Sequence, residues 1–268
     1  MQKVNRSVAV IALLLISAVV ALLAWRGQRL PTPPAAPAVE VAPAPPQPVE
    51  PAGAGRYPIS HAQGEAGTAG ETLPALDQSD AALMRAIQAM VHGDLAAAIF
   101  NPHDIARRIV ATIDNLPRSR VPSRIMAVRP AEGLLVVSGD NGELVLDPRN
   151  EARYTRYMDV LDEIDLAPAV GLYVQFYPLL QQAYRELGYP NGYFNDRVIE
   201  AVDDMLAAPV PDEPLRLEQP HVLYTFADPD LEARSSGQKI MLRIGAGNAQ
   251  RVKAKLRELR SRLTGISR

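Results

Sequence analysis

The sequence predicts a mainly α-helical globular domain with one small antiparallel β-hairpin, preceded by a single transmembrane helix and a disordered spacer rich in Pro, Ala and Gly. Three features of the 268-residue chain lead to this prediction: an uncharged apolar run near the N-terminus, a concentration of proline after it, and apolar residues at helical spacing further along. We divide the chain into a short cytoplasmic tail (1–7), a transmembrane anchor (8–25), a linker (26–74) and a mostly helical periplasmic domain (75–268).

The expected anchor is the uncharged run of residues 8–25, which has two basic residues before it and two after it. A helix of that length rises about 27 Å, close to the bilayer core of about 30 Å. A cleaved signal peptide is the alternative, because it also begins with basic residues and an apolar run. The run is longer than a signal peptide's usual apolar core of about 7 to 15 residues, and Trp25 and Arg26 stand where a small-residue cleavage site would be needed. These features favour an uncleaved anchor.

The region after the anchor has the composition of an extended spacer. Residues 31–58 contain ten of the 24 prolines, and a Gly-rich run follows from Gly53 to Gly70. Proline-rich chains are semi-rigid and hold a domain away from a surface. The basic residues are balanced on the two sides of the anchor, so charge alone does not decide its orientation. A long spacer and a chain without cysteine suit an oxidising compartment. We therefore predict a single-pass protein of the bacterial inner membrane with its C-terminal domain in the periplasm.

Six segments of the globular part show the apolar periodicity of helices. They are residues 79–93, 101–116, 154–164, 167–187, 194–207 and 248–263. In the second, Asn101 and Pro102 are the expected N-cap and first helical residue. The fourth is apolar on two faces, which predicts a central position in the core, and Pro178 is expected to kink or split it. Between these helices, the apolar runs on both sides of Asn141 and Gly142 predict a β-hairpin over residues 134–146.

Composition and spacing exclude several classes of function. The absence of cysteine excludes disulfides, cysteine-based zinc sites and cysteine nucleophiles. Removing residues 1–30 removes four basic and no acidic residues, and the remainder has 24 Lys and Arg against 30 Asp and Glu, a net charge of −6. This balance argues against nucleic-acid binding. The four histidines lack metal-ligand spacing on any expected helix, so we predict neither a metal nor another cofactor.

The candidate binding residues are Tyr189, Tyr193, Asn195, Asp196 and Arg197, which lie in and just after a turn rich in Pro and Gly. A turn on a rigid helical scaffold that presents aromatic, amide and guanidinium groups together is typical of recognition surfaces. Simple structural roles are the alternative. The tyrosines could pack in the core, and the asparagine could cap the following helix.

A row of acids follows on the helix expected at 194–207. Asp196, Glu200, Asp203 and Asp204 share one face, and three interpretations remain open. Paired carboxylates could perform glycosidase chemistry, which in a cell envelope would act on peptidoglycan. The row could be a solvated helix face. It could also meet the basic C-terminal helix, inside the fold or across a partner.

Three long runs resemble a known family. They are residues 177–209, 222–239 and 249–260, and the match extends over about residues 80–263. The chain resembles the bacterial family known as Domain of Unknown Function three thousand and fourteen. The resemblance implies a single N-terminal span, a proline-rich spacer and a helical envelope domain, and it assigns no catalytic residue or cofactor.

These observations lead to two functional hypotheses. The first is a non-enzymatic binding or scaffold module that faces the periplasm, is attached to the membrane by its N-terminal helix, and binds another cell-envelope protein or a cell-wall component. The second is a peptidoglycan-directed hydrolase that uses paired carboxylates such as Asp196 and Glu200. No sequence pattern names catalytic residues.

Overall fold

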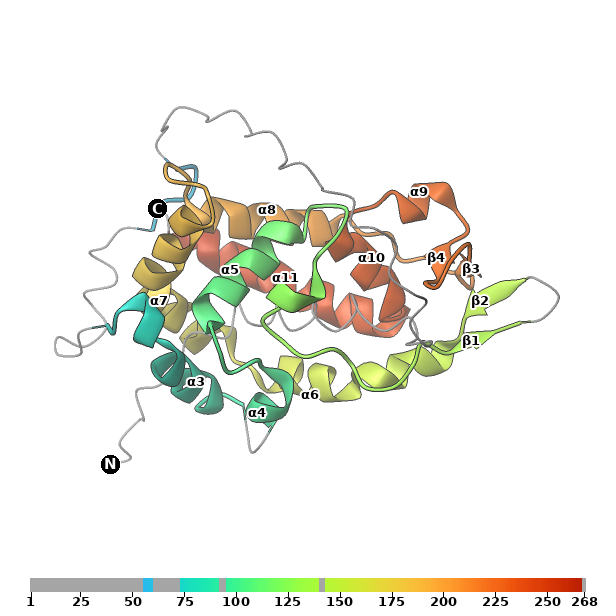
Figure 1. Cartoon of the computed structure of the whole chain (residues 1–268), viewed down its shortest axis with the longest axis horizontal. Coiled ribbons are helices and arrows are strands. Elements are labelled where there is room, and N and C mark those ends of the chain that lie inside the picture. The colour runs from blue at the N-terminus through green and yellow to red at the C-terminus, as the bar shows by residue number, and fades with distance from the viewer. Residues whose placement is uncertain (1–54, 60–72, 92–94, 140–142, 267–268) are drawn as a thin grey trace, which may run out of the picture.

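A computed structural model describes residues 55–59, 73–91, 95–139 and 143–266 (Figure 1). The predicted tail and anchor (1–25) and most of the predicted linker lie outside these residues. Within the described ranges, no helix is both long and apolar enough to cross a bilayer.

Helices make up most of the described chain, as predicted, and a small sheet accompanies them. The helices are α3 (Asp80–Gln88), α4 (Leu95–Ile99), α5 (Ile105–Asn115), α6 (Thr155–Glu163), α7 (Leu166–Glu186), α8 (Phe194–Leu206), α9 (Pro229–Glu232), α10 (Ser236–Arg243) and α11 (Ala246–Ile266). Short 3-10 helices are η1 (Leu76–Gln78), η2 (Ser123–Ile125) and η3 (Pro148–Tyr154). The strands are β1 (Val137–Ser138), β2 (Leu144–Leu146), β3 (Arg216–Glu218) and β4 (Thr225–Phe226).

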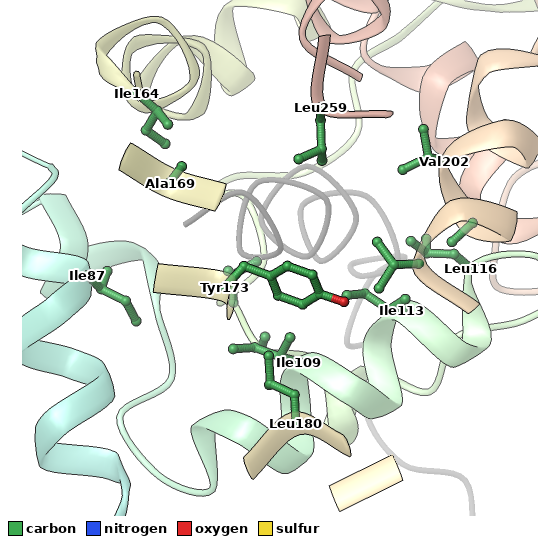
Figure 2. Packing of buried hydrophobic residues seen from close by; sticks show 14 of the residues in the cluster. Ile87, Ile109, Ile113, Leu116, Ile164, Ala169, Tyr173, Leu180, Val202 and Leu259 are labelled. Atoms are coloured by element: carbon green, nitrogen blue, oxygen red, sulfur yellow. The ribbon is translucent and has the colours of Figure 1, made fainter. Parts of the chain in front are cut away.

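Helix α7 is at the centre of the core, as its two apolar faces predict. It packs against α5, α8 and α11, and Tyr173 near its middle is fully buried. Figure 2 shows this ring among Ile109, Ile113 and Leu116, with Val202 and Leu259 in the same cluster. Pro178 lies inside α7 on an exposed position, and the helix continues through it to Glu186. Of the two expected effects of Pro178, the split is therefore wrong, and the kink stays a prediction.

The predicted start of the second helix is also wrong, because another helix supplies the cap. Helix α5 begins at Ile105, with Asp104 as N-cap in the left-handed region at φ 53°. The Asp80 carboxylate of α3 accepts the backbone N–H groups of Asp104 and Ile105, both at 2.8 Å. Asn101 instead donates its side-chain amide to the Met126 carbonyl at 2.8 Å. A carboxylate at the start of a helix satisfies its free N–H groups whatever its position in the sequence.

The predicted hairpin is present as β1 and β2, but it is half of a larger sheet. Four antiparallel strands lie in the order β1-β2-β3-β4, so the single hairpin is corrected to a four-stranded sheet. Strands β3 and β4 contain only three and two residues, too few for a period of two to be recognised. Leu146, Leu217, Phe226 and Leu242 form a second, smaller apolar cluster at this sheet. Figure 1 places the four-stranded sheet at the end of the domain opposite the α7–α8 turn.

Candidate functional site at the start of helix α8

The turn between α7 and α8 is held by a glutamine from the buried side of α7. Gly188, with φ 116°, follows the last residues of α7 and reverses the chain. The Gln181 side chain then donates to the Gly192 carbonyl at 2.7 Å and accepts the Phe194 N–H at 2.9 Å. Because one amide satisfies backbone groups before and after Tyr193, the turn is fixed relative to α7 and starts α8 in a defined direction.

Two of the five candidate residues, Tyr189 and Arg197, converge on a buried carboxylate. The Asp114 side chain at the end of α5 is 5% exposed and accepts the Arg197 Nε–H at 3.0 Å. The Tyr189 hydroxyl donates to the same carboxylate at 3.3 Å, and its ring stacks on Tyr184 with centroids 4.5 Å apart. These contacts fasten the turn and α8 to α5.

Arg197 also pairs with Glu200, one helical turn further along, with Nη1 and Oε2 separated by 2.6 Å. Burial lowers the pKa of Arg197, but the hydrogen bond that it donates to Glu200 and the charge of Asp114 outweigh this effect and raise the pKa above its ordinary value. The guanidinium is therefore a permanent cation between two acids. This placement supports a role for Arg197 in the packing of α8.

The other three candidate residues, Tyr193, Asn195 and Asp196, hold a segment from far upstream. The Asp196 carboxylate accepts the backbone N–H groups of Arg56 and Tyr57 at 2.8 and 2.7 Å. The Asn195 amide donates to the Tyr57 carbonyl at 2.9 Å. Residues 55–59 fall inside the range expected as linker, yet Figure 1 shows them, in blue, beside the α7–α8 turn.

Asn195 is prepared for this contact by the core. It is fully buried inside α8 rather than at its N-cap, which is Tyr193. The Tyr173 hydroxyl donates to the Asn195 side-chain oxygen at 2.9 Å, so the amide nitrogen points to the Tyr57 carbonyl. Burial of the Tyr173 ring raises the pKa of its hydroxyl well above the usual value. The tyrosine thus stays a proton donor, and the asparagine orientation is fixed by its partners on both sides.

Each member of the acid row has a partner within the fold. Glu200 pairs with Arg197, and Asp203 pairs with Arg260 of α11 at 2.5 Å. Asp204 accepts the Ser235 hydroxyl at 2.6 Å. Burial raises the pKa of Asp204, while the hydrogen bonds from Ser235 and Gln238 oppose the rise. Contact between the acidic row and the basic C-terminal helix, one of the three interpretations of the row, therefore occurs inside the fold at Asp203.

The site includes two residues that sequence reasoning missed, Asp114 and Tyr57. Asp114 is 83 residues from Arg197, and Tyr57 is 139 residues from Asp196. No local pattern connects residues at such separations. Among the residues that the structure describes, no three of His, Cys, Asp and Glu come together as a possible metal site.

Comparison with known proteins gives one match. The family described as "Protein of unknown function (DUF3014)" matches residues 105–260. This match confirms the resemblance inferred from the three long runs. No curated protein and no solved structure matches the chain.

Proposed function

Because the chain belongs to the DUF3014 family, whose description assigns no activity, we propose its function from the site itself. The protein is a non-enzymatic binding or scaffold module, anchored in the bacterial inner membrane by residues 8–25. Its helical domain faces the periplasm and binds another envelope protein at the surface formed by Tyr193, Asn195 and Asp196.

One observation carries the proposal: two adjacent side chains of this surface bond to three backbone groups of one polypeptide segment. Asp196 accepts two consecutive N–H groups and Asn195 donates to a carbonyl. Hydrogen bonds donated to a carboxylate are among the stronger hydrogen bonds in proteins. Hydrogen bonds to the main chain of a bound segment are a recurring means by which domains recognise peptides.

The hydrolase alternative has no observation of its own in favour. A general acid or base must reach the substrate proton that it transfers. Both oxygens of Asp196 accept backbone N–H groups, and Glu200 pairs with a guanidinium. The acids support the fold and hold a segment of chain, which favours binding over catalysis.

Photo-crosslinking in living cells tests the binding role. A photoreactive residue replaces Tyr193, whose exposed fraction is 38%, and a control protein carries it at Leu223, exposed by 55% at the far end of the domain. We expect a crosslinked envelope protein from position 193 alone. Asp196→Asn should abolish it, and the control Asp162→Asn on α6, where the carboxylate pairs with Arg251, should not. Equal products from both positions, or no effect of Asp196→Asn, would contradict the assigned surface.

A separate experiment tests the location. A reporter enzyme that needs disulfides is fused after Arg268, and it should be active because the domain is expected in an oxidising compartment. Activity of a cytoplasmic reporter at the same position would reverse the orientation. Release of muropeptides from purified cell wall, lost in Glu200→Gln, would instead favour the hydrolase.

A further inference from the structure

The docked segment shows which backbone features the surface reads. Asp196 bonds to the N–H groups of two successive residues, and Asn195 bonds to the carbonyl of the second. A peptide can make these contacts only if neither of those two residues is proline, because proline lacks an N–H. The next residue, Pro58, makes no demand of this kind. The chain bends at Arg56 and Tyr57, which lets both N–H groups reach the same carboxylate.

The side chains of the segment show what the surface accepts around that backbone. Gly55 lies over the Tyr193 ring so closely that an added Cβ would come within 2.6 Å of its Cγ atom. Tyr57 packs against the main core, and Ile59 is 8% exposed. Asp203 raises the pKa of Arg260 on α11, and the Tyr57 side chain contributes to the same rise. The segment therefore reaches from the start of α8 to α11, with the pattern Gly, any non-proline residue, aromatic, Pro, apolar.

We propose that this surface is a peptide-binding site whose ligand is a segment of another envelope protein with that pattern, and that residues 55–59 occupy the site as a tethered competitor. The inference rests on the proposed binding function and names its ligand class. The site bonds to backbone N–H and carbonyl groups, which every polypeptide has, so a segment of another protein can make the same hydrogen bonds. The docked segment belongs to the same chain as the domain and precedes it by residues 60–72 in the sequence, so a free peptide must displace a covalently attached competitor.

The tether sets the strength of this competition. Thirteen residues (60–72) connect the docked segment to the domain, and a connection of that length corresponds to an effective concentration of about 1 mM. If the segment and a free peptide of the same sequence share a Kd of about 0.1 mM, the effective concentration of the segment is about ten times that Kd. The free peptide would therefore bind about tenfold more weakly to the unmodified chain. Releasing the segment should restore the full affinity.

The experiment uses the full chain in detergent micelles and a fluorescent peptide of the sequence Gly-Arg-Tyr-Pro-Ile. Tyr57→Pro removes one of the two N–H groups that Asp196 binds and leaves the surface unchanged. Arg56→Pro removes the other and serves if the first variant folds poorly. Fluorescence anisotropy should show peptide binding about tenfold or more tighter to either variant than to the unmodified chain.

Two controls locate the binding. In the Tyr57→Pro background, Asp196→Asn should abolish binding, whereas Asp162→Asn on α6, where the carboxylate pairs with Arg251, should preserve it. A peptide methylated on the tyrosine nitrogen, which keeps every side chain, should also fail to bind.

Three results would overturn the inference. Absence of binding to folded Tyr57→Pro and Arg56→Pro chains at millimolar peptide would show that the segment is only part of the core. Binding that ignores Asp196→Asn would place the peptide elsewhere. Concentration-dependent dimers of the unmodified chain, lost with Asp196→Asn, would make a second copy the occupant. The crosslinking experiment at position 193 judges the broader binding role independently of all three.

Discussion

The ion pair between Arg197 and Asp114 gives the sharpest test of how the turn is held. Both side chains are well buried, 13% and 5% exposed, and Nε lies 3.0 Å from the carboxylate. Removing one partner of a buried pair leaves an uncompensated charge and costs about 3 to 5 kcal/mol of unfolding free energy. Arg197 would keep Glu200 as a partner, so we expect Asp114→Ala to cost about 3 kcal/mol, the lower end of that range.

Thermal unfolding followed by circular dichroism measures this cost. For a domain of about 150 to 250 residues, 3 kcal/mol corresponds to a fall in Tm of about 6 to 12 °C. Arg197→Ala should produce a similar fall, and the double variant should lose about 1 to 3 kcal/mol less than the sum, because the two residues share one interaction. Asp77→Ala is the control. It breaks a pair with Arg107 in which the aspartate side chain is 80% exposed, and it should cost less than about 1 kcal/mol.

Two results would refute this reasoning. The first is a loss below about 1 kcal/mol for Asp114→Ala, the level of an exposed pair. The second is strict additivity in the double variant, which would mean that the two side chains act independently. Peptide capture by the folded fraction of Arg197→Ala should be unchanged in either case, since its guanidinium pairs with Asp114 and Glu200.

Three further predictions concern the support of Asn195, the Asp147 carboxylate and the docked segment. Tyr173→Phe removes the hydroxyl that bonds to the buried Asn195 oxygen and should lower the unfolding free energy by about 1 to 2 kcal/mol in a urea titration, whereas an unchanged midpoint would show that the bond is dispensable. Hydrogen bonds from Arg149 hold the pKa of Asp147 at about 2, below its usual 3.8. The contribution of the ionised Asp147 carboxylate to stability is therefore complete above about pH 4 and is lost as the pH falls toward 2. Asp147→Asn should flatten the curve of unfolding free energy against pH in that range. A curve identical to that of the unmodified chain would contradict the assignment. Gly55→Ala forces a Cβ toward the Tyr193 ring and should increase trypsin cleavage after Arg56 severalfold, because proteases require local release of the chain.

Much of the helical core follows from local patterns in the sequence. The spacing of apolar residues predicts α7 and α8 within one residue of their observed ends, and the two apolar faces of α7 predict its central place. The apolar runs on both sides of the Asn-Gly pair predict the first two strands. Helix periodicity and turn chemistry depend on neighbouring residues, so they can be read without the fold.

Features that depend on distant partners could not be predicted in this way. The start of α5 depends on a carboxylate from α3, and the sheet gains two strands that are too short to show periodicity. The candidate residues Tyr189 and Arg197 stand beside Asn195 and Asp196 in the sequence, with the same mixture of chemical types. Their roles differ only because their partners differ, and those partners lie 75 to 140 residues away in the sequence. Tyr189 and Arg197 fasten the turn, whereas Asn195 and Asp196 hold the upstream segment.

The sequence by itself therefore determined the family, the position of a candidate recognition turn and the longer helices, but not the short helices α4, α9 and α10, because apolar period, turn residues and long characteristic runs are local properties. The tertiary structure alone decided what each side chain of that turn does. It brings Asp114 under Arg197 and residues 55–59 against Asp196. The physical reason is that hydrogen bonds and ion pairs depend on distances in space, and packing around α7 sets those distances for residues that no sequence spacing relates.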